Sequence, residues 1–236
     1  MATYPTTLEV RQISVLLRGE PEPINAWIQR WSTARAGLYV AVIAVGTGLY
    51  GAAMGFWREP LQGCYTAIKL PLIILLTTLG NGMLNAMLAP LLGLNLGFRQ
   101  SLQAVLMSFT ISAAILGSFS PVIFFMVWNA PPMSAQASAS YRFILLTHVG
   151  VIAFAGMVGN LRLGQLLRRL AGSETVARRV LVAWLAGNFL LGTQLSWILR
   201  PFIGSPHLPV QFLRPHPFDG NFFEAIFETL RRLLSP

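Results

Sequence analysis

Long runs without a charged residue dominate the pattern of apolar and polar positions along this chain. A helix rises about 1.5 Å per residue, so roughly 20 apolar residues are needed to cross the hydrocarbon core of a bilayer. The chain has five such runs, at 36–57, 70–98, 100–141, 143–161 and 180–199. These segments are apolar on all faces, whereas helices of a soluble bundle keep one polar face. The pattern therefore predicts an all-α, polytopic membrane helix bundle.

Two of the runs contain helix breakers that set narrower boundaries. Pro90 ends the apolar stretch that begins at Leu70, and the sequence Asn129-Ala130-Pro131-Pro132 follows the third helix. The predicted spans are about 36–56, 70–90, 102–128, 143–161 and 180–199. The chain then divides into an N-terminal juxtamembrane segment, a transmembrane domain and a Pro-rich tail, at 1–35, 36–200 and 201–236.

Amphipathic interfacial helices are predicted at both ends of the chain. Residues 8–18 and 24–31 place apolar side chains at helical spacing, and the last 14 or so residues form a helix too short to span a bilayer. The side chains expected to contact lipid headgroups or a partner are Trp27, Trp31, Arg168, Arg169, Arg200, Phe223, Phe227 and Arg231.

Composition supports the membrane interpretation and adds an orientation. Only 11% of the residues are charged, against about 25% in soluble domains. The 17 Lys and Arg outnumber the 8 Asp and Glu, but they cluster between the apolar runs. This spacing favours contact with anionic lipids of the bilayer over nucleic acid. Ten of them lie on the side of the membrane that carries the N-terminus and seven on the other side, which predicts a cytoplasmic N-terminus and a C-terminus on the opposite side.

Small residues follow one face of the first span at alternating spacings of four and three. They are Gly37, Ala41, Ala44, Gly48, Gly51 and Gly55. Small side chains let helix backbones approach closely, which matters in lipid because no hydrophobic effect drives helices together there. The stripe predicts a tightly packed seam, with packing inside the chain favoured over a dimer face.

Polar side chains are few in the predicted spans, and none of these spans contains Asp, Glu, Lys or Arg. The candidates are Thr78, Asn81, Asn85, His148, Asn188 and Gln194. Amides at membrane depth must find partners, so they either hold helices together, which is favoured, or line a small polar cavity. His148 lacks an acidic partner in any span, which favours an interfacial or hydrogen-bonded histidine over a functional one.

Two segments carry a family resemblance: Lys69-Leu70-Pro71-Leu72 before the second span, and Leu94-Asn95-Leu96-Gly97-Phe98-Arg99-Gln100-Ser101 after it. Over roughly residues 36–200 the chain resembles bacterial members of the Yip1-like membrane family. The resemblance implies five spans and a cytoplasmic N-terminus. It also implies a location in the bacterial inner membrane, which would place the C-terminus in the periplasm. The segments Arg200–Pro206 and Asn221–Glu224 resemble features of an uncharacterised bacterial subgroup.

Three functions fit these features. The favoured one is a non-enzymatic scaffold or accessory subunit of a larger membrane complex. The second is a transporter or channel for a neutral or lipidic solute, which would use Thr78, Asn81 and Asn85. The third is a lipid-acting enzyme with His148, His207 or His216 as its base. The sequence contains no catalytic or metal-binding motif, and its single Cys64 excludes a Cys-rich site, so no catalytic residue, metal or cofactor is predicted.

Overall fold

A computed structural model describes residues 11–132, 138–205 and 208–234, and this part of the chain is helical without strands. The helices are α1 (Arg11–Arg18), α2 (Pro21–Gln29), α3 (Thr33–Phe56), α4 (Pro60–Leu91), α5 (Phe98–Trp128), α6 (Ser138–Ala171), α7 (Glu174–Ile198) and α8 (Phe222–Leu234). The predicted all-α class is confirmed.

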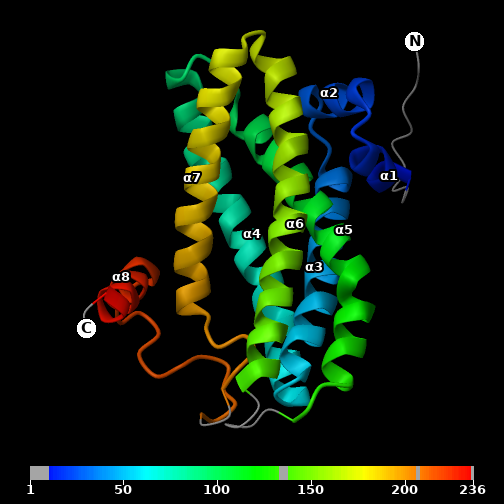
Figure 1. Ribbon diagram of the computed structural model, residues 1–236. Coiled ribbons are helices and arrows are strands. Elements are labelled where there is room, and N and C mark those ends of the chain that lie inside the picture. Colours follow the sequence, from blue (N-terminus) through cyan, green and yellow to red (C-terminus); the bar gives the residue numbers. More distant parts are fainter. Residues whose placement is uncertain (1–10, 133–137, 206–207, 235–236) are drawn as a thin grey trace.

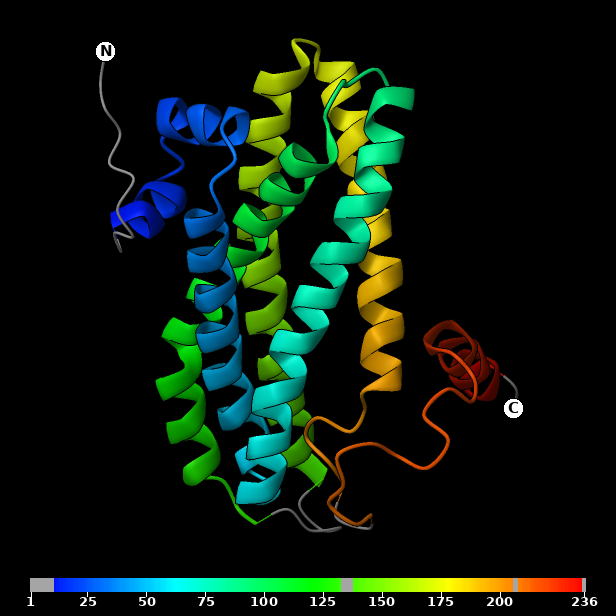
Figure 2. The same cartoon turned by 180° about the vertical axis from the view of Figure 1, so that it is seen from behind.

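Helices α3 to α7 lie side by side in an upright bundle (Figure 1). All five are long and apolar enough to cross a membrane, so the chain is a multi-pass membrane protein. An odd number of crossings places the two ends of the chain at different ends of the bundle. Helices α1 and α2 lie at one end, and the tail and α8 lie toward the other (Figures 1 and 2).

The packing of the five helices is uneven. Helix α3 packs against both α4 and α5, α5 also packs against α4 and α6, and α7 bridges α4 and α6 at the edge of the bundle. Trp184 of α7 is fully buried, whereas the following stretch 185–198 is only half-buried or exposed. The C-terminal half of α7 is therefore less enclosed by the bundle than its first half.

Two helices run well past the spans expected from the sequence. Helix α4 begins at Pro60 rather than Leu70, and α6 continues to Ala171 rather than ending at Leu161. The prediction placed these two boundaries at the charged side chains Lys69 and Arg162. The hydrogen bonds of a helix continue equally well where the helix leaves the membrane and enters water. Proline suits the first turn of a helix, which explains the start at Pro60. The predicted span 70–90 holds no charged residue, but the longer helix α4 also contains Lys69.

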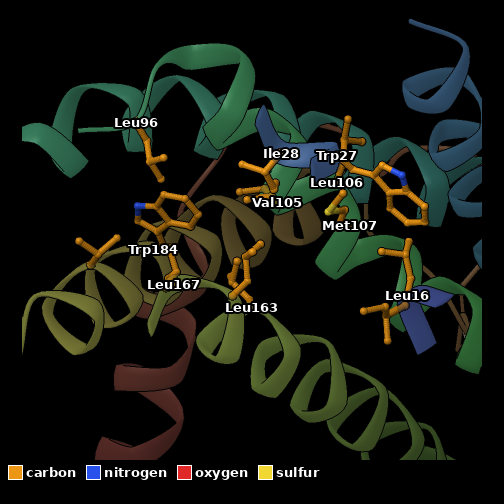
Figure 3. Close-up of a cluster of buried hydrophobic side chains, with 14 of the residues drawn as sticks. Leu16, Trp27, Ile28, Leu96, Val105, Leu106, Met107, Leu163, Leu167 and Trp184 are labelled. Atoms are coloured by element: carbon orange, nitrogen blue, oxygen red, sulfur yellow. The ribbon is translucent and has the colours of Figure 1, made fainter. Parts of the chain in front are cut away.

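The main core cluster lies at the end that carries α1 and α2. Leu16 of α1 and Trp27 and Ile28 of α2 are buried against α5 and α6, with Trp184 at the far side of the same cluster (Figure 3). The predicted short N-terminal helices are present, but they dock on the bundle. Trp27 is only 7% exposed, so its predicted contact with lipid is replaced by packing inside the chain.

Candidate functional site

The C-terminal half of the small-residue stripe on α3 is closed by α4. A Cβ atom added at Gly51 would lie 2.5 Å from the Thr66 carbonyl oxygen, and one at Gly55 would lie 2.5 Å from that of Gln62. At Gly48 the corresponding distance to the Ala67 carbonyl is 3.3 Å. Only glycine allows the two backbones this close at Gly51 and Gly55, so this half of the stripe sets the α3–α4 contact.

The N-terminal half of the same stripe has no such cover. Gly37 has nothing within 4 Å of an added Cβ, Gly37 and Ala41 are exposed, and Ala44 is half-buried. Beside this half, a groove of about 430 Å³ runs between α3 and α5. Its walls are formed by Ala41, Val42, Val45, Gly46, Leu49, Ala114, Gly117 and Ser118.

A polar cluster holds the tail to the bundle. It lies on the N-terminal extension of α4, residues 60–69. Gln62 Nε2 donates hydrogen bonds to the carbonyl oxygens of Pro201 at 3.0 Å and Phe202 at 2.8 Å. Thr66 Oγ1 donates to the Phe202 carbonyl at 2.7 Å, and Lys69 Nζ donates to the Pro201 carbonyl at 2.7 Å. Three side chains at spacings of four and three thus bind two successive backbone carbonyls.

Lys69 is fully buried although its described partners include no carboxylate. Its ammonium group lies 5.8 Å from the ring centre of Phe202 and 5.0 Å from that of Phe212. Aromatic faces attract cations most strongly where water is excluded, so the two rings and the carbonyl together replace the hydration of the charge. The tail therefore forms the polar and aromatic surroundings that Lys69 needs.

Sequence reasoning missed this cluster because it took Lys69 as the boundary of a loop. The signal was present: Pro60 is a typical first helical residue, and Gln62, Thr66 and Lys69 follow on one helical face. The segment that follows Arg200 provides the acceptors of this contact, which are the carbonyl oxygens of Pro201 and Phe202.

Arg200, predicted to contact a partner, is also held inside the chain. Its guanidinium carbon lies 3.7 Å from the centre of the Trp197 ring, and Nη1 donates to the Trp197 carbonyl. Burial lowers the pKa of the Arg200 guanidinium from its ordinary value, nearby Arg214 lowers it further, and Asp219 acts in the opposite direction. These contacts fix the turn that leads from α7 into the tail.

The intramembrane amides lie between α4 and α7. Asn81 Nδ2 donates to Asn188 Oδ1 at 2.6 Å and to the Trp184 carbonyl at 3.3 Å. Thr78 donates to the Ile74 carbonyl of its own helix at 2.7 Å. Asn85 is fully buried, and its side-chain amide has no hydrogen-bond partner among the described residues. The structure thus joins Asn81 to Asn188 across the helices, but leaves Asn85 apart from that pair.

His148 of α6 contacts the hydroxyl group of Tyr50 on α3. Its Nδ1 lies 2.9 Å from Tyr50 Oη, and the two rings meet edge to face with their centres 5.6 Å apart. Both side chains are buried. A histidine base in a hydrolytic enzyme needs a nucleophile or carboxylate nearby, and the partner here is the Tyr50 hydroxyl. His216 is exposed in the tail, and His207 lies outside the described residues.

The remaining candidates lie near the ends of the bundle. The Phe223 ring packs edge to face against Phe189 of α7, and Gln194 Oε1 accepts a hydrogen bond from the Phe222 amide. Phe227 is 69% exposed, and Arg231 is also exposed. At the other end, Arg168 forms an ion pair with Glu174 at 3.2 Å, Arg169 is exposed and Trp31 is half-buried.

Comparison of the chain with protein-family models, with curated proteins and with solved structures finds no match.

Proposed function

We propose that the protein is a non-enzymatic accessory or scaffold subunit that binds a transmembrane helix of another protein along the N-terminal half of α3. The observation that carries the proposal is the uncovered half of the small-residue stripe. Gly37 and Ala41 are exposed, although they continue the line of Gly48, Gly51 and Gly55 that α4 covers.

The groove beside this half supports a helix rather than a single lipid chain as its occupant. Small residues contribute little to contact with fluid lipid, but they let two helix backbones approach and pack. The groove is edged by small residues on both helices, Ala41 on α3 and Ala114 on α5, while Gly46 and Gly117 pack against each other at its floor. Ala41 belongs both to the open stripe and to the edge of this groove, so a partner helix on the stripe would lie beside the groove.

A transporter for a neutral or lipidic solute is the second candidate. Asn85, buried without a hydrogen-bond partner among the described residues, is the observation that favours it. Against it, Asn81 bonds to α7 and Thr78 bonds to its own helix. The two larger described cavities, of about 370 and 430 Å³, have other residues in their walls. These contacts favour helix packing over a polar path.

We also propose a bacterial inner membrane as the location, with α1 and α2 on the cytoplasmic side. The arginines that gather at that end of the bundle support this orientation. Membership of the Yip1-like family stays a prediction from the two sequence segments that resemble it.

The proposal is tested by purifying tagged protein in mild detergent and identifying what accompanies it. The variant Gly37→Leu places a large side chain on the open stripe. The matched control is Gly150→Leu on α6, where an added Cβ also meets nothing within 4 Å. We expect one membrane protein to co-purify with wild type and with the control, and to be reduced at least tenfold with Gly37→Leu. Equal recovery from both variants would contradict the proposed binding face.

A further inference from the structure

A small cleft lies where the turn between α1 and α2 meets the extension of α6 beyond Leu161. Its volume is about 30 Å³. The α1–α2 side of the cleft consists of Gly19, Pro21, Ile24 and Asn25, and the α6 side consists of Arg162, Gln165, Leu166 and Arg169.

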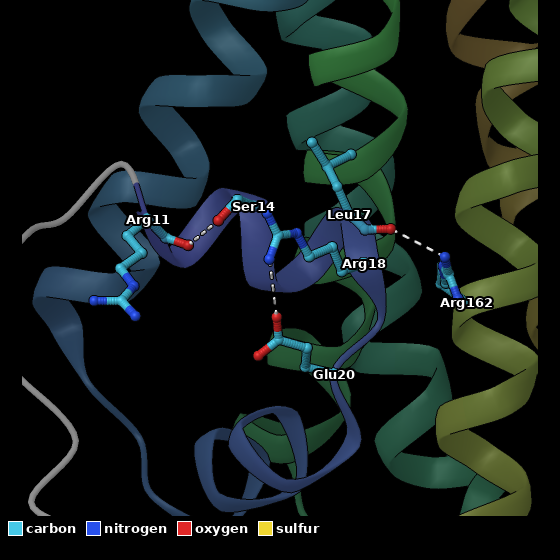
Figure 4. Close-up of polar contacts among 6 residues, drawn as sticks. All are labelled: Arg11, Ser14, Leu17, Arg18, Glu20 and Arg162. Atoms are coloured by element: carbon cyan, nitrogen blue, oxygen red, sulfur yellow. Dashed lines mark hydrogen bonds and ion pairs between the residues drawn. The ribbon is translucent and has the colours of Figure 1, made fainter.

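Arg162 is fixed in the wall of this cleft by two hydrogen bonds. Nη2 donates to the Leu17 carbonyl at 3.0 Å, across the gap between α6 and α1 (Figure 4). Nη1 donates to Gln165 Oε1 at 3.0 Å. Gly19 has a φ of +72°, and a Cβ there would lie 2.5 Å from Arg162 Nη1, so glycine is needed both for the turn and for the guanidinium.

The cleft is rich in positive charge and in hydrogen-bond donors. Arg169 follows Arg162 by two helical turns on the same face, and neither has a carboxylate within 4.0 Å among the described residues. The nearby Glu20 faces Arg18 instead, at 3.9 Å (Figure 4). Asn25 Oδ1 is buried without a partner, and the opposite orientation of this amide would present two further donors.

The position of the cleft matches the headgroup layer of a bilayer. Arg162 directly follows the apolar run 143–161, so its guanidinium marks the end of the hydrocarbon core. A single water molecule needs about 10–15 Å³ of such space, so a cleft of about 30 Å³ has room for about two oxygen atoms. A phosphodiester has two free oxygens, and arginine forks bind them with paired hydrogen bonds.

We propose that this cleft binds the phosphate group of an anionic phospholipid, with Arg162 and Arg169 as the two cationic ligands. Asn25 completes the site from α2. The lipid would join α1 and α2 to α6 and so fasten the docked N-terminal segment to the membrane surface. This site is separate from the partner face on α3 and does not depend on it.

The test is native mass spectrometry of the full chain, delipidated and then supplied with phosphatidylglycerol, phosphatidylcholine or inorganic phosphate alone. Arg169→Gln is the main variant because Arg169 makes no described contact that the fold needs. Arg178→Gln, an exposed arginine on α7 at the same end of the bundle, is the matched control. We expect one phosphatidylglycerol to bind wild type and the control, and Arg169→Gln to lower its affinity about tenfold. Arg169→Lys keeps the charge without the fork and should fall between them.

Three results would overturn the proposal. One is an equal loss of phosphatidylglycerol in Arg169→Gln and Arg178→Gln, which would indicate general surface attraction. Another is equal binding of phosphatidylcholine, which would remove the preference for an anionic lipid. The third is saturation by inorganic phosphate at the same affinity as the lipid, which would make free phosphate the ligand.

Discussion

The two halves of α3 carry the same kind of residue but lie in different surroundings. Around Gly51 and Gly55, α4 approaches so closely that its carbonyl oxygens occupy the place of a side chain. Around Gly37 and Ala41, none of the described helices covers the stripe. One half is thus used up by intrachain packing, whereas the other is available to a partner.

The closed half depends on the early start of α4 at Pro60. Gly51 and Gly55 meet the backbone at Thr66 and Gln62, which belong to the extension before Lys69. Without that extension, this half of the stripe would also be open. The extension has a second role, since the side chains of Gln62, Thr66 and Lys69 bind the tail. The closed end of the bundle is therefore built from α3, α4 and the tail together.

The largest effect is expected at the closed half of the stripe. Gly51→Ala and Gly55→Ala each force the α3 and α4 backbones apart, and overpacking of this kind costs about 1–3 kcal/mol. Gly37→Ala meets no neighbour and should change the free energy of unfolding by less than about 0.5 kcal/mol. Denaturant unfolding in detergent measures all three. A similar loss at Gly37 would mean that the two halves do not differ.

The next effect is expected at the tail contact, and it should be local to that contact. The double variant Gln62→Ala, Lys69→Met removes both side-chain donors that bind the Pro201 carbonyl, at a cost of about 1–3 kcal/mol for that contact. We expect proteases to cut the tail faster while the bundle still melts cooperatively. Cys64→Ala, an exposed neighbour on the same extension, serves as control. Unchanged cleavage in the double variant would show that the cluster does not hold the tail.

The amide pair should contribute less. Asn188→Ala removes the partner of Asn81, and interhelical hydrogen bonds in membranes are worth about 0.6 to 1.7 kcal/mol. Thr193→Val on the same helix should be nearly neutral because Thr193 bonds only to its own helix. Unfolding measurements that rank these two variants in the opposite order would disagree with the described contacts.

The smallest effect is expected for Tyr50→Phe. This change removes the hydroxyl that lies 2.9 Å from His148 Nδ1 and leaves the ring packing in place, for a loss of about 0.6 kcal/mol. Tyr65→Phe is the control, since its described contact is a ring contact with Phe212. A loss well above 2 kcal/mol would indicate that the pair belongs to a larger polar network.

Sequence patterns predicted the number of long helices and the amphipathic ends because both depend on local periodicity. They did not predict where α4 begins, since Lys69 was taken to end the span, although a helix can bury lysine where carbonyls and aromatic rings replace water. They placed Asn81 and Asn188 in separate spans, but could not pair them. They also could not tell which half of the α3 stripe α4 would cover, because that depends on the tilt between two helices.

The central claim is that a partner helix lies on the open half of α3, and site-specific photocrosslinking in intact membranes tests it most directly. A crosslinking amino acid replaces Ala41 in one variant and Gly150 in another, both of which are exposed. We expect a single adduct between position 41 and a different membrane protein, and none from position 150. Adducts with lipid alone at both positions, or a dimer of this chain at position 41, would contradict it.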